Sequence, residues 1–209
     1  MKKIFLDVGG HVGQTLNEVL SDKYCFDMVY CFEPMPAQFI YLKENYKNSN
    51  LTILNYGLLD EQGDKIIYGS NNDMAASIFE NKVDIDNKGY RTLCNFVRTS
   101  DFFSQNISMD DLVIMKLNCE GSEVKIINDL IDTNEIWKVK NMMIDFDIRK
   151  VPGREYEAPL LLRKLSSINF TNFSLVDDVM IGSTHENRIG NWLSTLSFYN
   201  EILNKQLIN

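Results

Sequence analysis

An acid and a glycine turn follow the first apolar run of the chain. Residues 5–15 read FLDVGGHVGQT, in which Asp7 ends a strand-like segment and glycines precede a helix-like one. A second acid, Glu33, ends the strand-like run 28–32 (MVYCF). An acid in that place can accept hydrogen bonds from both hydroxyls of a ribose. The two acids and the glycine turn therefore predict a site for a nucleotide-type cofactor.

The spacing of the glycines narrows the choice of cofactor. A dinucleotide-binding fingerprint has glycines at relative positions one, three and six, and counting from Gly9 gives Gly9, His11 and Gln14. An acid ahead of the glycines would repel a pyrophosphate, but it would pair well with a cationic amino-acid group. S-adenosylmethionine joins such a group to ribose and adenine, so the sequence predicts this cofactor. A nicotinamide-dependent oxidoreductase is the alternative enzyme class.

Strand-like and helix-like segments alternate along the chain, which predicts an α/β fold with a mostly parallel sheet. The expected strands cover residues 4–8, 28–32, 51–56, 112–117, 141–148 and 170–176, with a short extra strand at 66–68. The expected helices cover residues 14–21, 123–131 and 157–167, and another begins at Pro36. The run 112–117 is placed at the centre of the sheet because it is short, continuous and apolar.

Two segments are harder to interpret. Residues 69–95 are polar and show no sustained period, which predicts an excursion that packs over the cofactor or substrate. Near the end of the chain, a last strand at 194–199 after a long loop at 177–193 is the preferred interpretation. The alternative is one helix over residues 191–206, on which Trp192, Leu196, Tyr199 and Leu203 would share a face.

Polar side chains stand at the ends of several expected strands. In an open parallel sheet, ligands bind outside the carboxyl ends of the strands, where the strand order reverses. Asp7, Glu33, Asn118 and Asp147 all fall at such ends. We therefore expect four polar side chains to converge on one rim of the sheet.

Composition limits the classes of partner. The chain has 209 residues, for which one domain over residues 1–209 is the default, and its formal charge is −8. That charge repels phosphate backbones and anionic membranes, which disfavours nucleic acid and membrane partners. The four cysteines show no metal-ligand spacing, and no apolar run approaches the length of a membrane span or signal peptide. We expect a cytoplasmic protein with reduced thiols, and its oligomeric state stays open.

Four ordered motifs point to a family. FLDVGGHVG at 5–13, CFEP at 31–34, GLLDEQGD at 57–64 and MKLNCEGSE at 115–123 resemble the FkbM-type S-adenosylmethionine-dependent methyltransferases. The resemblance extends to about Phe173. It implies a class I methyltransferase (Rossmann-like) fold, with a seven-stranded, mostly parallel sheet and helices on both faces. It also implies methyl transfer to a hydroxyl of a small acceptor, such as a sugar or a glycosylated or phosphorylated metabolite.

The resemblance also implies roles for residues, carried over by position. It places the amino-acid end of the cofactor at the glycine turn, the ribose at Glu33, the adenine beside Gly57 and the reacting groups near Lys116. The full set of implied cofactor-binding residues is Asp7, Gly9, Gly10, Gly13, Glu33, Gly57, Leu58, Asn118 and Glu120.

The candidate catalytic residues are His185, Asn118 and Lys116. The family usually has Asp where this chain has Asn118, and a neutral amide cannot accept a proton. Asn118 is therefore expected to orient a hydroxyl, and a catalytically weak cofactor-binding module of the same fold is a further alternative. His185, whose ordinary pKa is ~6.5, is expected in a loop at the active-site rim as the general base. Its other interpretation is a solvated surface histidine.

Four aspartates at the expected rim raise the question of a metal. Asp145, Asp147, Asp177 and Asp178 could surround a magnesium ion, which prefers oxygen ligands. Spacing alone does not place these oxygens around one centre. We favour a solvated acidic rim with a hairpin turn, and we expect no metal.

Overall fold

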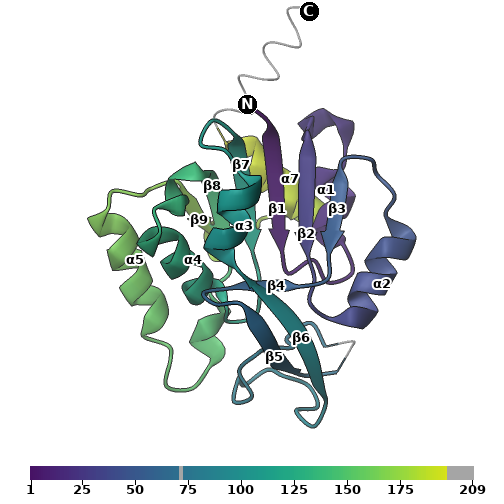
Figure 1. Ribbon diagram of the computed structural model, residues 1–209, viewed down its shortest axis with the longest axis vertical. Coiled ribbons are helices and arrows are strands. Elements are labelled where there is room, and N and C mark those ends of the chain that lie inside the picture. The colour runs from purple at the N-terminus through teal and green to yellow at the C-terminus, as the bar shows by residue number, and fades with distance from the viewer. Residues whose placement is uncertain (71–72, 197–209) are drawn as a thin grey trace, which may run out of the picture.

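A six-stranded parallel sheet forms the centre of the computed structural model, which describes residues 1–70 and 73–196. Its strands, in spatial order, are β3 (Leu51–Leu54), β2 (Met28–Phe32), β1 (Lys3–Val8), β7 (Leu112–Leu117), β8 (Val139–Ile144) and β9 (Phe173–Leu175). The chain runs outward from β1 to β3 on one side, and later from β7 to β9 on the other (Figure 1). The strand order therefore reverses between β1 and β7.

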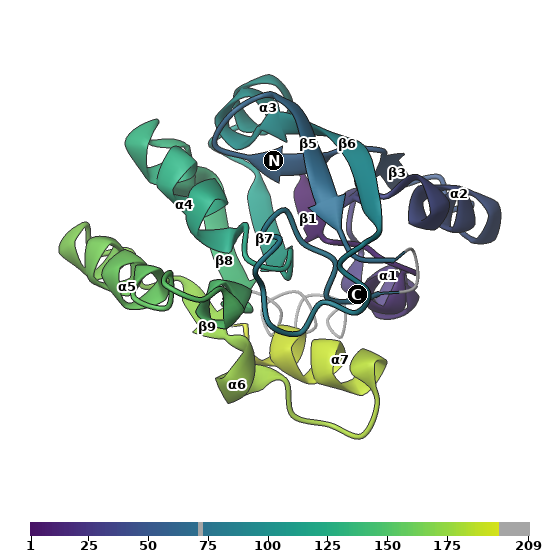
Figure 2. The same ribbon diagram turned by 90° about the horizontal axis from the view of Figure 1, so that it is seen from below.

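Helices cover both faces of this sheet, as Figures 1 and 2 show. One face packs against α3 (Thr99–Asn106), α4 (Glu123–Asp132) and α5 (Glu157–Ser167), and the other against α1 (Gln14–Val19), α2 (Pro36–Asn45) and α7 (His185–Thr195). Successive residues of β1 enter opposite cores, with Leu6 on the α3 side and Phe5 on the α1 side. Both faces are covered, which explains why β1 and β7 are apolar apart from Lys3, Asp7 and Lys116. The expected α/β fold is confirmed, whereas the described residues contain six strands of the central sheet and no seventh.

A second, three-stranded sheet lies beyond the carboxyl ends of β1 and β2 (Figure 1). Its order is β4 (Gly57–Leu59), β6 (Arg91–Arg98) and β5 (Gly63–Tyr68). The expected short strand at 66–68 is the end of β5, while β6 was not expected. Between β5 and β6 the chain makes the predicted excursion, which is pinned at its start by a bridge between Tyr68 and Ser77.

The C-terminal prediction of a strand is wrong for the part that the structure describes. Residues 177–193 are not a loop, since they contain most of α6 (Val176–Val179) and of α7, and residues 194–195 belong to α7. Ile189, Trp192 and Leu193 lie three and four positions apart and are buried in the core shared with α1. Burial of this face against α1 therefore stabilises a helix over this segment instead of a strand. The rest of the expected strand, residues 197–199, lies outside the described residues.

The fifth expected strand is also shorter than predicted. β8 ends at Ile144, and Asp147 begins a short 3-10 helix, η3 (Asp147–Lys150). The amide of Asp147 donates to the carbonyl of Asp145 at 2.9 Å, so these residues turn instead of alternating across a strand. The remaining short helices are η1 (Asp22–Tyr24) and η2 (Glu135–Lys138).

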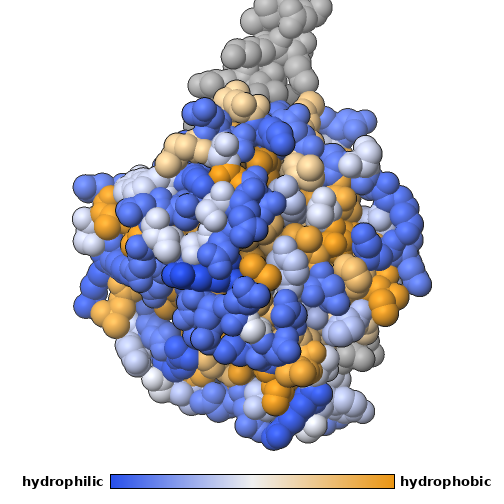
Figure 3. Space-filling view, viewed as in Figure 1, coloured by the Kyte–Doolittle hydropathy of each residue, from blue (hydrophilic) through white to orange (hydrophobic). Residues whose placement is uncertain are grey.

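The molecular surface seen in Figure 3 is mainly hydrophilic, with apolar residues scattered among polar ones. Such scattered apolar residues are ordinary for a protein surface. None of the helices in the described part of the chain has the length and apolar character needed to cross a membrane.

The packing of α7 leads to a stability prediction. Trp192→Ala should lower the free energy of unfolding by about 3–5 kcal/mol, because it removes a fully buried indole and leaves a cavity. Trp137 is 43% exposed, so Trp137→Ala is the matched control and should cost clearly less. Urea denaturation followed by circular dichroism measures both variants. Equal losses would contradict the assignment of α7 to the core.

Candidate active site

A cavity of about 460 Å³ opens where the strand order of the central sheet reverses. It is lined by Gly9 after β1, Glu33 after β2, Asn118 after β7 and Ser77 from the excursion. This volume lies within the range of small-molecule sites, and the position is the one at which open α/β sheets bind ligands. The cavity is therefore the candidate active site.

The glycine turn is shaped by close contact with the neighbouring strand. Gly9 has φ +85°, and a Cβ there would lie 1.9 Å from the carbonyl oxygen of Asn118, so no other residue fits. The amides of Gly9 and Gly10 both donate to the carbonyl of Phe32 at 3.1 Å. Gly9 and Gly10 line the cavity as predicted, whereas Gly13 contacts Tyr46 and is not among the lining residues.

Asp7 is fully buried and is not among the cavity-lining residues. Its Oδ1 accepts a hydrogen bond from Lys116 Nζ at 3.0 Å, and the same ammonium group donates to the carbonyl of Gly9 at 2.9 Å. Lys116 itself lines the cavity. The structure therefore places Asp7 behind Lys116, with two of the three ammonium protons of Lys116 used inside the protein.

Glu33 is a buried acid at the cavity wall, 5% exposed. Its Oε2 accepts from the amide of His11 at 2.7 Å, and its Oε1 accepts from the amide of Met35 at 2.8 Å. Burial raises the pKa of Glu33 to about 7, although these two amides act in the opposite direction. Each carboxylate oxygen has a second lone pair, so the group can still accept from ligand hydroxyls.

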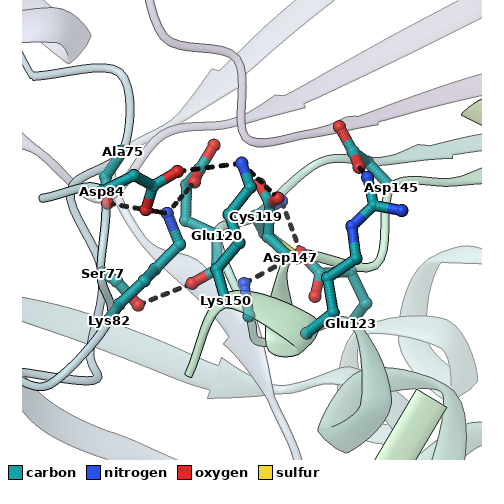
Figure 4. Close-up of polar contacts among 12 residues, drawn as sticks. Ala75, Ser77, Lys82, Asp84, Cys119, Glu120, Glu123, Asp145, Asp147 and Lys150 are labelled. Carbon is teal, nitrogen blue, oxygen red and sulfur yellow. Dashed lines mark hydrogen bonds and ion pairs between the residues drawn. The ribbon is translucent and has the colours of Figure 1, made fainter. Parts of the chain in front are cut away.

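Glu120 connects the turn after β7 to the excursion (Figure 4). Lys82, which is 0% exposed, donates to Glu120 Oε2 at 2.7 Å and to Asp84 Oδ1 at 2.5 Å. Ser77 donates its hydroxyl to the carbonyl oxygen of Glu120 at 2.5 Å. The role of Lys82 is not apparent from the sequence, because nothing in the polar excursion distinguishes it from a surface lysine.

A second lysine, Lys150, extends this network from Asp84 to Asp147. Lys150 Nζ lies 2.9 Å from Asp84 Oδ2 and 2.7 Å from Asp147 Oδ1. Burial and the neighbouring Asp147 raise the pKa of Glu120 to about 8, whereas Lys82 acts to lower it. The acids at this end of the cavity are thus held by two lysines, Lys82 and Lys150, that the excursion and η3 supply.

Three of the four possible magnesium ligands are held by cationic side chains. Arg149 contacts Asp145 at 3.6 Å and Asp177 at 2.8 Å, while Asp147 is held by Lys150. Within residues 1–70 and 73–196, no group of three or more His, Cys, Asp or Glu side chains is arranged to hold a metal ion.

His185 lines the cavity, but it is the first residue of α7 and not part of a loop. Its Nε2 lies 3.1 Å from the hydroxyl of Thr15 in α1. Burial and the charge of Lys116 lower the pKa of His185. The other predicted residues Asn118, Gly57 and Leu58 also line the cavity.

Several buried polar atoms at the cavity have no hydrogen-bond partner within the described residues. They are Gln38 Oε1, Asp73 Oδ2, Asn118 Oδ1 and both ring nitrogens of His11, and all four residues line the cavity. The three oxygens are acceptors, so a ligand rich in donors would satisfy them. S-adenosylmethionine carries an ammonium group, ribose hydroxyls and an adenine amine, and therefore fits the residues present.

Glu123, in the last of the sequence motifs, is fully buried at the start of α4. Its Oε1 accepts from the amides of Cys119 and Gly121, at 3.1 and 3.0 Å. This closes the turn that carries Glu120 into the cavity. Glu123 thus acts as a buried hydrogen-bond acceptor that shapes the start of α4.

Among the comparisons of this chain with known proteins, a match is found to a solved structure. No family model and no curated protein matches the chain. Among solved structures, the crystal structure of Methyltransferase FkbM from Methylobacillus flagellatus KT resembles it over 80% of this chain, with 16% sequence identity and a TM-score of 0.46. The matched part covers 37% of that methyltransferase. It bears the name of the family that the motifs resemble, but a likeness this low carries no argument about function.

The raised pKa of Glu123 leads to a prediction about stability and pH. Burial raises that pKa from 4.5 to about 7, so the folded protein retains a proton that the unfolded chain releases in this window. The free energy of unfolding should therefore fall as pH rises from 4.5 to 7, with a contribution on the order of 3 kcal/mol from this group. Urea denaturation across this range should show a smaller fall for Glu123→Gln. Glu155→Gln, at an exposed position, is the control, and coinciding Glu123→Gln and wild-type profiles would contradict the prediction.

Proposed function

We propose that this protein is an S-adenosylmethionine-dependent methyltransferase that methylates a hydroxyl of a small acceptor. A sugar, or a glycosylated or phosphorylated metabolite, is the acceptor class that the sequence motifs imply. The observation that carries the proposal is the meeting of the glycine turn, buried Glu33 and Asn118 at one cavity between β1 and β7. The formal charge of −8 supports a small-molecule acceptor over nucleic acid.

The cofactor would lie along the carboxyl ends of β2 and β1. Glu33 would accept the ribose hydroxyls, Gly57 and Leu58 would border the adenine, and Gly9 and Gly10 would lie beside the amino-acid end. When bound, S-adenosylmethionine supplies an electrophilic methyl group on a sulfonium. The end of the cavity beside β7 and η3 would then be left for the acceptor.

The chain's own residues would position the acceptor and accept its proton. Asn118 is neutral and has a buried, unpartnered Oδ1, so it can accept a hydrogen bond from the acceptor hydroxyl and orient it. His185, held by Thr15, is the proposed base. Its lowered pKa keeps the imidazole neutral at physiological pH, which is the form that takes up a proton.

Calorimetric titration with S-adenosylhomocysteine tests the cofactor assignment. We expect the wild-type protein to bind and, above pH 7 where Glu33 is mostly ionised, Glu33→Gln to weaken binding at least about tenfold, because the ribose loses a charged acceptor. Glu44→Gln is the control, because Glu44 is an exposed acid of α2, the helix that follows Glu33 in the chain. A wild-type protein that shows no binding at millimolar ligand would refute the proposed function.

The role of His185 is tested by separating turnover from binding. We expect His185→Ala to lower the formation of S-adenosylhomocysteine, measured with a panel of sugar acceptors, by about 100-fold or more. Its affinity for S-adenosylhomocysteine should stay close to that of the wild type. Turnover at the wild-type rate would remove His185 from the catalytic set.

A further inference from the structure

Asp73, in the excursion, is a carboxylate that the sequence analysis did not single out. It is 8% exposed, and it lines the cavity. Its Oδ1 accepts from the amide of Ala75 at 2.8 Å, whereas its buried Oδ2 has no partner among the described residues. A buried carboxylate oxygen without a partner is costly, which makes this atom a candidate for contact with a ligand.

The segment that carries Asp73 is held in place at the cavity. Ser77 pairs with Tyr68 through backbone bonds of 2.8 and 3.0 Å and donates its hydroxyl to Glu120. The amide of Asp73 donates to the carbonyl of Ser70 at 3.0 Å. These contacts fix the backbone of Asp73 relative to β5 and to the turn after β7.

Gly9, Gly10 and His11 of the glycine turn line the same cavity as Asp73. Burial and the charge of Lys116 lower the pKa of His11, whereas the charge of Asp73 acts in the opposite direction. Lys116 and Asp73 thus present opposite charges near the same imidazole. The amino-acid end of S-adenosylmethionine also carries opposite charges, a carboxylate and an ammonium group.

Asp7, which the sequence predicts for the ammonium group, is poorly placed to receive it. Its Oδ1 accepts from Lys116, and its Oδ2, like that of Asp73, is buried without a partner among the described residues. Asp7 is 0% exposed and does not line the cavity, whereas Asp73 and Lys116 do, so a ligand in the cavity meets Lys116 before Asp7. A carboxylate on the cavity wall would balance the charge of Lys116 where an ammonium group enters.

We propose that Asp73, and not Asp7, binds the α-ammonium group of the cofactor, an inference that rests on the proposed function. The excursion then belongs to the cofactor site as well as to the acceptor site. A charged hydrogen bond in a buried place is worth more than a neutral one, so its loss should be measurable as a drop in affinity.

Two ligands that differ in the amino-acid part test this proposal on the full-length protein. S-adenosylhomocysteine carries the α-ammonium group, whereas 5′-methylthioadenosine lacks the whole amino-acid part and cannot reach Asp73. By calorimetry, Asp73→Asn should bind S-adenosylhomocysteine about tenfold more weakly than wild type and 5′-methylthioadenosine within about twofold. Asp73→Glu retains the charge and should bind S-adenosylhomocysteine at least about threefold more tightly than Asp73→Asn.

Asp86→Asn is the matched control, because Asp86 is an exposed acid of the same excursion, and it should leave both affinities unchanged. Unchanged affinity of Asp73→Asn for S-adenosylhomocysteine would overturn the inference. Equal losses of affinity for S-adenosylhomocysteine and 5′-methylthioadenosine would also overturn it, and so would equal losses in Asp73→Asn and Asp86→Asn. These outcomes would leave the proposed function standing, provided that the wild type binds S-adenosylhomocysteine. A wild type that does not bind it would refute both.

Discussion

The buried ion pair between Asp7 and Lys116 is the interaction on which the site depends. The two residues are direct neighbours in the register of β1 and β7, the strands between which the chain reverses its order. A buried lysine without its carboxylate would be strongly destabilising, so neither residue can be replaced alone at small cost. Because Lys116 also holds the carbonyl of Gly9, the pair fixes the glycine turn against the end of β7. The floor of the cavity follows from this arrangement.

The opposite wall of the cavity comes from a different part of the chain and is held by different forces. Lys82 and Lys150 each connect two acids, and together they join the excursion, the turn after β7 and η3. Charge balance inside this wall matters because burial, and next the nearby Asp147, raise the pKa of Glu120. Lys82 and Lys150 therefore hold the acids of this wall in place, and the same acids hold the two lysines.

Local patterns predicted the parts of the fold in which one physical signal dominates. The bounds of β2, β7 and α5 were predicted as observed, because continuous apolar runs and helical periodicity mark them clearly. Glu33 and Asn118 reach the cavity because strand ends meet at one rim of a parallel sheet. For the segment of α7, a strand was preferred and a helix over residues 191–206 was only the alternative, since the burial of α7 against α1 involves a segment far away in sequence. Likewise, Lys82 and Asp73 acquire their surroundings only when the excursion folds over the sheet.

Strand ends form the floor of the cavity, and one excursion forms much of its wall. This division has an evolutionary consequence. The excursion leaves β5 and returns at β6, at the rim of a small sheet outside the central one. Apart from Asp73 and Lys82, its sequence can drift or lengthen without disturbing the hydrogen-bond ladders of the six parallel strands. Descendants of such a scaffold can therefore acquire new selectivities by remodelling a single contiguous stretch of polypeptide.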